Sequence, residues 1–284
     1  MSKANVAIAT DSTSNIPDDL AARYNIHIIP QILNWEGESL LDGVDITTDE
    51  FYARLAISKE IPTTSQASSG AFKDFFTRIA KSSESIVGIF VSGALSGTLD
   101  SARNGAELAE DVPIEIIDSR SASMGLGFIA IAAARAAEAG LGPFEVAQVA
   151  EDLIPRMRLM FVLDTLEFIH RGGRIGGAQR FVGTVLSIKP LLHLYDGKVE
   201  PLESIRTKKK AIERMLSLAE EDTRCSSAVH AAVLDAAIST EAAEIHDQVV
   251  ARLKPDELIQ ADLSPVVGAH TGPGTVGLVY YCEE

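Results

Sequence analysis

Three short segments, far apart in the chain, are rich in hydroxyl groups and glycine. They are residues 63–66 (Thr-Thr-Ser-Gln), 92–98 (Ser-Gly-Ala-Leu-Ser-Gly-Thr) and 268–274 (Gly-Ala-His-Thr-Gly-Pro-Gly). Hydroxyl groups donate directional hydrogen bonds without the strong hydration of a lysine, and glycine lets backbone N–H groups come close to an anion. We therefore expect these segments to hold a small carboxylate in a partly dry pocket.

Each of these positions also has an ordinary structural use. Thr64 could cap the helix that follows it, and Ser96 could cap its own helix. Ser65 and Ser92 could equally support their loops, and the glycines around His270 could serve only tight turns. Spacing alone does not decide between these structural roles and a role in binding a carboxylate.

Known catalytic motifs offer one alternative function. Ser96 as nucleophile and His270 as base, completed by Asp118 or Asp262, would make a serine-type hydrolase of acyl esters. The residues around Ser96 do not form the Gly-x-Ser-x-Gly elbow that such enzymes use. The two classes separate by experiment, because a hydrolase turns over an activated acyl ester and a carrier retains intact ligand.

Nucleotide chemistry is not expected on this chain. No Gly-x-x-x-x-Gly-Lys-Ser/Thr loop occurs, and residues 93–98 lack the lysine. Residues 125–130 fit Gly-x-Gly-x-x-Ala, but they lie several residues after the preceding predicted strand and no acidic residue ends a second strand at the right distance. We interpret them as the start of a helix rich in small residues.

Composition excludes several classes of protein. The net charge of −15 argues against nucleic-acid binding, and the longest apolar stretches, such as residues 124–134, are too short to span a bilayer. Two cysteines are too few for a disulfide framework, and the first residues lack the apolar core of a secretion signal. We expect a cytoplasmic protein without stable membrane insertion.

The first half of the chain alternates predicted strands and helices. Strands are expected at 6–10, 26–33, 86–91 and 113–117, and helices at 47–57, 72–79, 97–110 and 124–139. This alternation predicts a mostly parallel sheet with flanking helices, in which ligands bind at the carboxyl ends of strands. Ser96 would then lie near a helix N-terminus, which favours an anion, and Thr64 in a loop before the next helix.

The second half predicts an α/β lobe with antiparallel pairing. After a helix over 143–155, we expect strands at 158–163, 191–195, 198–202, 228–234, 258–261, 266–269 and 276–281, with helices at 166–170, after Thr207, and at 240–253. Asp196-Gly197 suits the turn of a hairpin. We place an N-terminal lobe at 1–157 and a C-terminal lobe at 158–284, and expect the ligand between or beneath the two.

Two glycine-rich or basic stretches in this half have two readings each. Arg171 and Arg174 flank Gly172-Gly173, so a guanidinium could project from a bare turn toward a phosphate or a partner carboxylate, or both arginines could be solvated. Residues 206–210 (Arg-Thr-Lys-Lys-Lys) form a basic cluster in an acidic chain. It is either the solvated first turn of a helix or a docking patch.

The same motifs resemble the DegV family, whose signatures run Thr-Ser-Gln-Pro-Ser, Ser-x-x-Leu-Ser-Gly-Thr, Gly-Gly-Arg-Ile and Gly-x-His-x-Gly-Pro-Gly. The matching residues are 64–68, 92–98, 172–175 and 268–274, with further matches at 11–13, 118–120, 189–190 and 206–207. The resemblance covers essentially the whole chain. It departs at Ala67, where the family usually has proline, and at Leu99-Asp100, where tyrosine and glutamine are more common.

The resemblance implies a non-catalytic carrier for a long-chain fatty acid. Such a carrier buries the acyl chain and presents the carboxylate to a separate ATP-dependent fatty acid kinase, which makes acyl phosphate for phospholipid synthesis. The resemblance implies no metal and no cofactor beside the bound fatty acid. By the match to the motifs, Thr64 Oγ1, Ser96 Oγ and the Gly97 N–H hold the carboxylate and His270 lies nearby, while Ser65 and Ser92 support the site. Two arginines, Arg174 and Arg206, would face the kinase or the phosphate.

Overall fold

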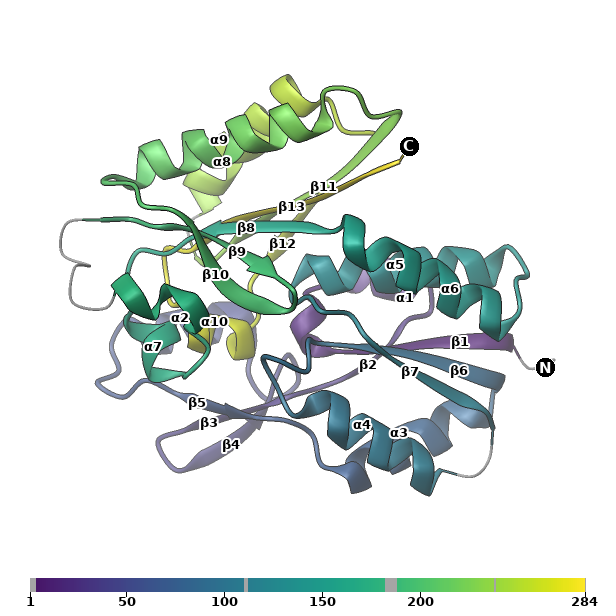
Figure 1. The fold of residues 1–284 in the computed structure, drawn as a ribbon. Coiled ribbons are helices and arrows are strands. Elements are labelled where there is room, and N and C mark those ends of the chain that lie inside the picture. The colour runs from purple at the N-terminus through teal and green to yellow at the C-terminus, as the bar shows by residue number, and fades with distance from the viewer. Residues whose placement is uncertain (1–3, 110–111, 182–187, 238, 284) are drawn as a thin grey trace. The chain divides into compact units, whose positions relative to one another are not determined.

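Residues 4–109, 112–181, 188–237 and 239–283 are described in this computed structural model (Figure 1). Contacts divide the chain into two compact units. The first unit comprises Met1–Asp45 and Thr64–Pro155, and the second comprises Ile46–Thr63 and Arg156–Glu284. The second unit is therefore built from two separate stretches of chain, whereas the sequence places a single boundary near residue 157.

The first unit is centred on a four-stranded sheet in which every neighbouring pair is parallel. Its strands are, in sheet order, β2 (His27–Ile29), β1 (Ala4–Asp11), β6 (Ser83–Phe90) and β7 (Ile114–Asp118). The central strands are almost continuously buried, as expected for a sheet covered on both faces. The predicted mostly parallel sheet is confirmed.

Helices cover both faces of this sheet (Figure 1). On one face, Phe72, Phe76 and Leu99 join a buried cluster with the strands, and on the other face α5 and α6 pack on β1 and β6. The helices of the unit are α1 (Asp18–Arg23), α3 (Ser69–Ala80), α4 (Thr98–Leu108), α5 (Met124–Glu138) and α6 (Pro143–Leu153), with a 3-10 turn η1 (Ser12–Ser14) after β1.

A small second sheet changes two of the expectations for this unit. It has the order β4-β3-β5, with β3 (Ile32–Trp35), β4 (Glu38–Leu41) and β5 (Thr63–Ser65). The single strand predicted over 26–33 is wrong, because the chain leaves the parallel sheet at Pro30, which has no N–H to donate, and enters the small sheet after Gln31. Thr64 lies in β5 and not in a loop.

The second unit contains a six-stranded mixed sheet. Its strands are, in sheet order, β10 (Lys198–Glu203), β9 (Leu191–Tyr195), β8 (Arg158–Val162), β13 (Val276–Glu283), β11 (Ala228–Asp235) and β12 (Glu257–Asp262). Only β11 and β12 pair in parallel among these neighbours. Asp196 and Gly197 both have positive φ, 47° and 76°, which confirms the predicted hairpin turn.

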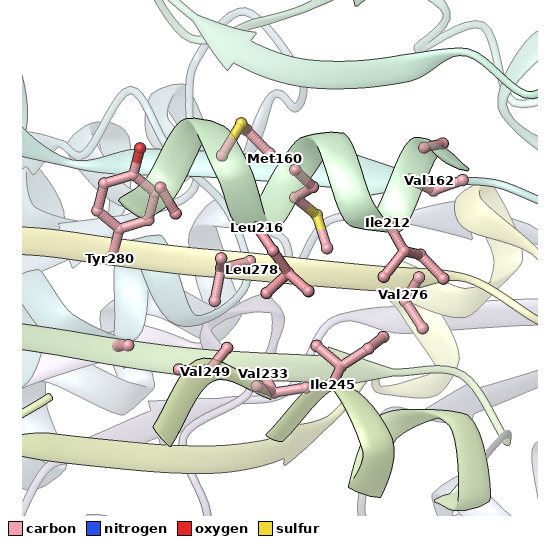
Figure 2. Close-up of a cluster of buried hydrophobic side chains, with 14 of the residues drawn as sticks. Met160, Val162, Ile212, Leu216, Val233, Ile245, Val249, Val276, Leu278 and Tyr280 are labelled. Carbon is pink, nitrogen blue, oxygen red and sulfur yellow. The ribbon is translucent and has the colours of Figure 1, made fainter. Parts of the chain in front are cut away.

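Two long helices, α8 (Lys208–Thr223) and α9 (Ser239–Leu253), build the core of this unit with the sheet. Figure 2 shows Ile212 and Leu216 of α8, Ile245 and Val249 of α9, and strand residues such as Leu278 in one buried cluster. The predicted antiparallel α/β lobe is confirmed. Within the described ranges of the chain, no helix combines the length and apolar character that crossing a bilayer requires.

Shorter elements complete the second unit and include one correction. They are α2 (Thr48–Leu55), the 3-10 turn η2 (Ile154–Arg156) at the unit boundary, α7 (Glu167–Arg171), the 3-10 turn η3 (Gly176–Phe181) and α10 (Pro265–Thr271). The capping box of Thr47 with Glu50 and the cap of α8 by Thr207 are both confirmed. The strand predicted over 266–269 is wrong: these residues belong to α10, since Pro265 suits a first helical turn and both edges of β13 are already paired.

Candidate functional site

Two of the hydroxyl-rich segments meet in the first unit at one buried side chain. Gln31, only 2% exposed, lies between β2 and β3. Its Oε1 accepts a hydrogen bond from the Ala67 N–H at 3.1 Å and one from Thr98 Oγ1 at 3.4 Å. Ala67 follows the Thr64 segment and Thr98 begins α4. A single amide oxygen therefore joins the two segments that the sequence predicts to bind a carboxylate.

Ser96 lies just before the first turn of α4 and is half-buried. Its Oγ is 2.8 Å from Thr98 Oγ1 and accepts the Thr98 N–H at 3.2 Å. The N-cap residue of α4 is Gly97, not Ser96, and Gly97 makes no side-chain cap. The Ser96 hydroxyl thus stands at a helix N-terminus, where backbone N–H groups favour negative charge, without serving as the N-cap.

Thr64 occupies the middle of β5 and is half-buried. The capping reading of Thr64 is wrong, because Ser68 caps α3 by accepting the Ala71 N–H at 3.2 Å. The neighbouring hydroxyl of Ser65 accepts a hydrogen bond from Asn34 Nδ2 at 3.1 Å, which ties β5 to β3. Ser65 is accordingly placed to support the strand on which Thr64 lies.

The loop that carries Ser96 is held in shape by polar groups at the ends of β6 and β7. Ser92 Oγ accepts the Ala94 N–H at 3.2 Å, and the Ser92 N–H donates to Ser121 O at 2.9 Å. Asp118 Oδ1 accepts the N–H groups of Gly93, at 3.3 Å, and Arg120, at 2.9 Å. Ser92 and Asp118 therefore both act on the backbone of this loop.

A fully buried carboxylate supports the same loop from β1. Asp11 accepts the Val91 N–H at 2.9 Å and the Thr13 hydroxyl at 2.6 Å. Burial raises the pKa of Asp11, and the hydrogen bonds from Thr13 and Val91 oppose that shift. In the part of the chain that the structure describes, no three His, Cys, Asp or Glu side chains group so as to hold a metal ion.

The third segment lies in the second unit and places His270 on α10, beside α7. Helix α7 ends in a Schellman motif: Gly173 has φ 73° and donates to His170 O, while the Arg174 N–H donates to Ile169 O at 3.1 Å. A Cβ at Gly172 would overlap the His270 ring. Glycine at this turn is therefore what lets the imidazole pack against α7.

His270 is electrically neutral at physiological pH. Burial lowers the pKa of His270 to about 4, and the positive charge of Arg174 contributes to the same shift. Arg174 is half-buried, and its Nη1 donates to Gly172 O at 2.6 Å. A histidine with this pKa is a weak general base at neutral pH, and its neutral ring carries one N–H donor and one acceptor nitrogen.

The carboxylates considered for a triad have surroundings that suit other roles. Asp118 accepts two backbone N–H groups and so holds the loop that carries Ser96. Asp262 is exposed at the end of β12, where desolvation of its carboxyl and the nearby charges of Asp235 and Asp49 raise its pKa. A triad instead needs a buried, ionised carboxylate that orients the histidine. Neither aspartate has that environment.

One lysine of the basic stretch 206–210 has a structural role. Lys208 Nζ donates to Gly274 O at 2.6 Å and pairs with Glu241 at 2.5 Å and Asp164 at 3.4 Å, which ties α8 to the loop after His270. Arg206, just before the Thr207 cap, is exposed, as are Lys209 and Lys210. Arg206 is thus available to a partner.

Sequence reasoning missed Gln31 and Thr98 as residues of the site. Thr98 belongs to a recognised motif, but only as its last letter. Gln31 lies close to Pro30 in an apolar run that the pattern assigns to a strand, although a lone polar residue in such a run is a signal of a buried polar contact. Lys208 stands out in the sequence only as one charge in a basic cluster.

We expect the acid sensitivity of the protein to reveal the neutral state of His270. Between its ordinary pKa of 6.5 and the folded value of about 4, the unfolded chain binds a proton that the folded chain does not. The free energy of unfolding therefore falls as pH drops through this range, by up to about 1.4 kcal/mol per pH unit. Urea unfolding of the parent protein and His270→Gln across this range measures it; parallel losses in both would contradict the assignment.

Comparison with known proteins places these features in a family. A family model described as an uncharacterised protein of the DegV family matches residues 5–283. A DegV domain-containing protein of Streptomyces coelicolor is 37% identical over 276 residues, which cover 96% of this chain and 97% of that protein.

Two solved structures share the fold over their whole length. A DegV family protein from Thermus thermophilus, described by its fatty acid binding, has a TM-score of 0.92 and 33% identity, covering 98% of this chain and 99% of the other. DegV from Bacillus subtilis, described as a fatty acid binding protein, has a TM-score of 0.92 and 31% identity, covering 99% and 100%. The chain therefore belongs to the DegV family.

Proposed function

We propose that this protein is a cytoplasmic fatty-acid carrier that buries an acyl chain and presents its carboxylate to a separate ATP-dependent kinase. The observation that carries the proposal is the meeting of the Thr64 and Ser96 segments at Gln31, in a chain whose relatives from Thermus thermophilus and Bacillus subtilis are described as binding fatty acids. The proposal needs no metal or cofactor, and the fatty acid itself is the ligand.

The chemistry of the head group supports this assignment. A buried carboxylate needs two or three donors, since burying it without partners costs several kcal/mol or protonates it. We assign Thr64 Oγ1, Ser96 Oγ and the Gly97 N–H as donors, supported by Ser65 and Ser92. His270 of the second unit is neutral and half-buried, and we assign it as a hydrogen-bonding group and not as a counter-ion for a carboxylate.

The acyl chain would supply most of the affinity. Each buried methylene contributes about 0.8 kcal/mol, so a chain of about 16 carbons offers on the order of 10 kcal/mol before the cost of association. A head group held by neutral donors then sets orientation more than affinity. This division suits a carrier, which has to bind a lipid firmly and still leave its carboxyl group reactive.

The alternative function, a serine-type hydrolase of acyl esters, has less support. The Ser96 hydroxyl is engaged with Thr98, at 2.8 Å, and His270 has a pKa of about 4. An activated nucleophile needs a base whose pKa is close to the working pH. Ester turnover is therefore the outcome against which the carrier assignment is tested.

Lipid extraction is the experiment that tests the proposed function. The purified full-length protein is denatured, extracted with organic solvent and examined by mass spectrometry; we expect about one fatty acid for each chain, because the buried tail makes release slow. Delipidated protein should take up palmitate to the same ratio. Failure to retain or take up any fatty acid, or turnover of an activated acyl ester that Ser96→Ala abolishes, would overturn the carrier assignment.

Removing a hydroxyl group that is proposed to donate to the carboxylate should weaken binding of the fatty acid. We expect Thr64→Ala and Ser96→Ala each to reduce the affinity for palmitate by about 1 to 3 kcal/mol, measured by titration calorimetry of delipidated protein. Hexadecan-1-ol, which has the same tail and no charge, is the matched ligand. The two substitutions should reduce its affinity much less than that of palmitate. Unchanged palmitate affinity in both variants would refute the site.

Removing the exposed arginine should affect the kinase step and not lipid binding. Arg206→Gln is expected to lower acyl-phosphate formation by the partner kinase by about tenfold or more, since a charge-assisted contact is lost, with palmitate affinity unchanged. Arg174→Gln should act in the same direction. Arg103→Gln, which removes an exposed positive charge from α4, is the control. A collapse of palmitate binding in Arg206→Gln would contradict the docking role.

A further inference from the structure

We propose that Thr98 is a positioning residue that sets the direction of the Ser96 hydroxyl through a three-membered relay of Ser96, Thr98 and Gln31. The inference rests on the proposed carboxylate site and adds to it a residue that never touches the ligand. Thr98 is 0% exposed and Gln31 is 2% exposed, while Ser96 is half-buried at the outer end of the relay. Only Ser96 is therefore open to a ligand.

The direction of the inner end is settled by the amide of Gln31. Its Oε1 accepts the Ala67 N–H at 3.1 Å, and an amide NH₂ group could not accept that bond. The atom facing Thr98 Oγ1 at 3.4 Å is therefore an acceptor. The backbone of Gln31 is held as well, since its N–H donates to Ser12 Oγ at 3.1 Å. The relay thus begins at a fixed acceptor.

Counting protons leaves two states for the relay. Each hydroxyl has one proton to donate. In the inward state, Thr98 donates to Gln31 Oε1, so Ser96 donates across the 2.8 Å contact to Thr98 and has no proton left for a ligand. In the outward state, Thr98 donates to Ser96 Oγ, and the Ser96 proton is free to point away from the relay.

A carboxylate selects the outward state because it only accepts hydrogen bonds. Turning the relay outward gives up the 3.4 Å bond to Gln31, which is the longest of the set, while Oε1 keeps the Ala67 N–H. In that state Ser96 Oγ accepts from both the Thr98 hydroxyl and the Thr98 N–H, at 3.2 Å in the structure. Donors to Ser96 Oγ polarise its O–H bond, so Ser96 becomes a stronger donor to the anion.

A double-mutant cycle tests whether Thr98 acts through Ser96. The variants are Thr98→Val, which keeps the shape of the buried side chain and removes the hydroxyl, Ser96→Ala, and the pair combined. Each is delipidated as full-length protein and titrated with palmitate. We expect Thr98→Val to weaken binding by about threefold to tenfold, and to cause less than about a twofold further loss when Ser96 is already alanine.

Two controls separate positioning from folding. Thr98→Ser retains the hydroxyl and should bind palmitate within about twofold of the parent protein. Thermal unfolding is recorded for every variant, and Thr98→Ala, which removes the hydroxyl without adding an apolar group, replaces Thr98→Val in the same cycle if the valine variant does not fold. A role in packing alone would give equal losses with and without the Ser96 hydroxyl.

The outcomes distinguish this inference from the proposed function. If Ser96→Ala weakens binding and Thr98→Val does not, or if the two losses simply multiply, the relay is refuted and the carboxylate site stands. If Ser96→Ala leaves palmitate binding unchanged, the site assignment itself fails. Weakening by Thr98→Val that disappears in the Ser96→Ala background, together with retention by Thr98→Ser, supports the relay.

Discussion

The site-bearing part of the first unit depends on the hydrogen bonds that the side-chain amide oxygen of Gln31, Oε1, accepts. This oxygen accepts the N–H of Ala67, which follows β5, and the hydroxyl of Thr98, which begins α4. Both donors are buried, and each would cost about 1 to 3 kcal/mol if left without a partner. The chain can place an acceptor there only because it leaves the parallel sheet at Pro30. The break between β2 and β3 is thus part of the site.

In the second unit, the corresponding constraint is the close packing of helices α7 and α10. Gly172 leaves room for the His270 ring, and Gly272, with φ 75°, lies where any side chain would overlap the ring of Phe168. The close approach of α7 and α10 buries the imidazole, and burial is the main cause of its low pKa. The glycines of this motif therefore set the charge state of a histidine as well as the path of the backbone.

Local signals in the sequence predicted most of the fold. Buried apolar runs predicted β1, β6 and β7, the Thr47–Glu50 capping box predicted the start of α2, and Asp196-Gly197 predicted the hairpin. The errors arose where the structure of a segment depends on its packing against several other elements. A short apolar run such as 266–269 is compatible with a strand or a helix, and the choice depended on which edges of β13 were already paired. The grouping of residues 46–63 with the second unit has no local signal at all.

The site was predicted only in part for the same reason. Thr64 and Ser96 stand out by residue type and motif, whereas Gln31 acts through contacts with residues distant in sequence. On the proposed function, the donors to the anion are the hydroxyl groups of Thr64 and Ser96 and the Gly97 N–H, so a chain with a net charge of −15 needs no cationic side chain to hold it.

On the proposed function, a carboxylate oxygen attacks the γ-phosphorus of ATP while the bond to ADP breaks. A lysine or arginine paired with that carboxylate would draw charge from the attacking oxygen, whereas hydroxyl donors orient it and leave it more nucleophilic. A carrier also needs a head-group site that forms on binding and later releases the product. The long hydrogen bond from Thr98 Oγ1 to Gln31 Oε1, at 3.4 Å, fits this need because it is given up at little cost.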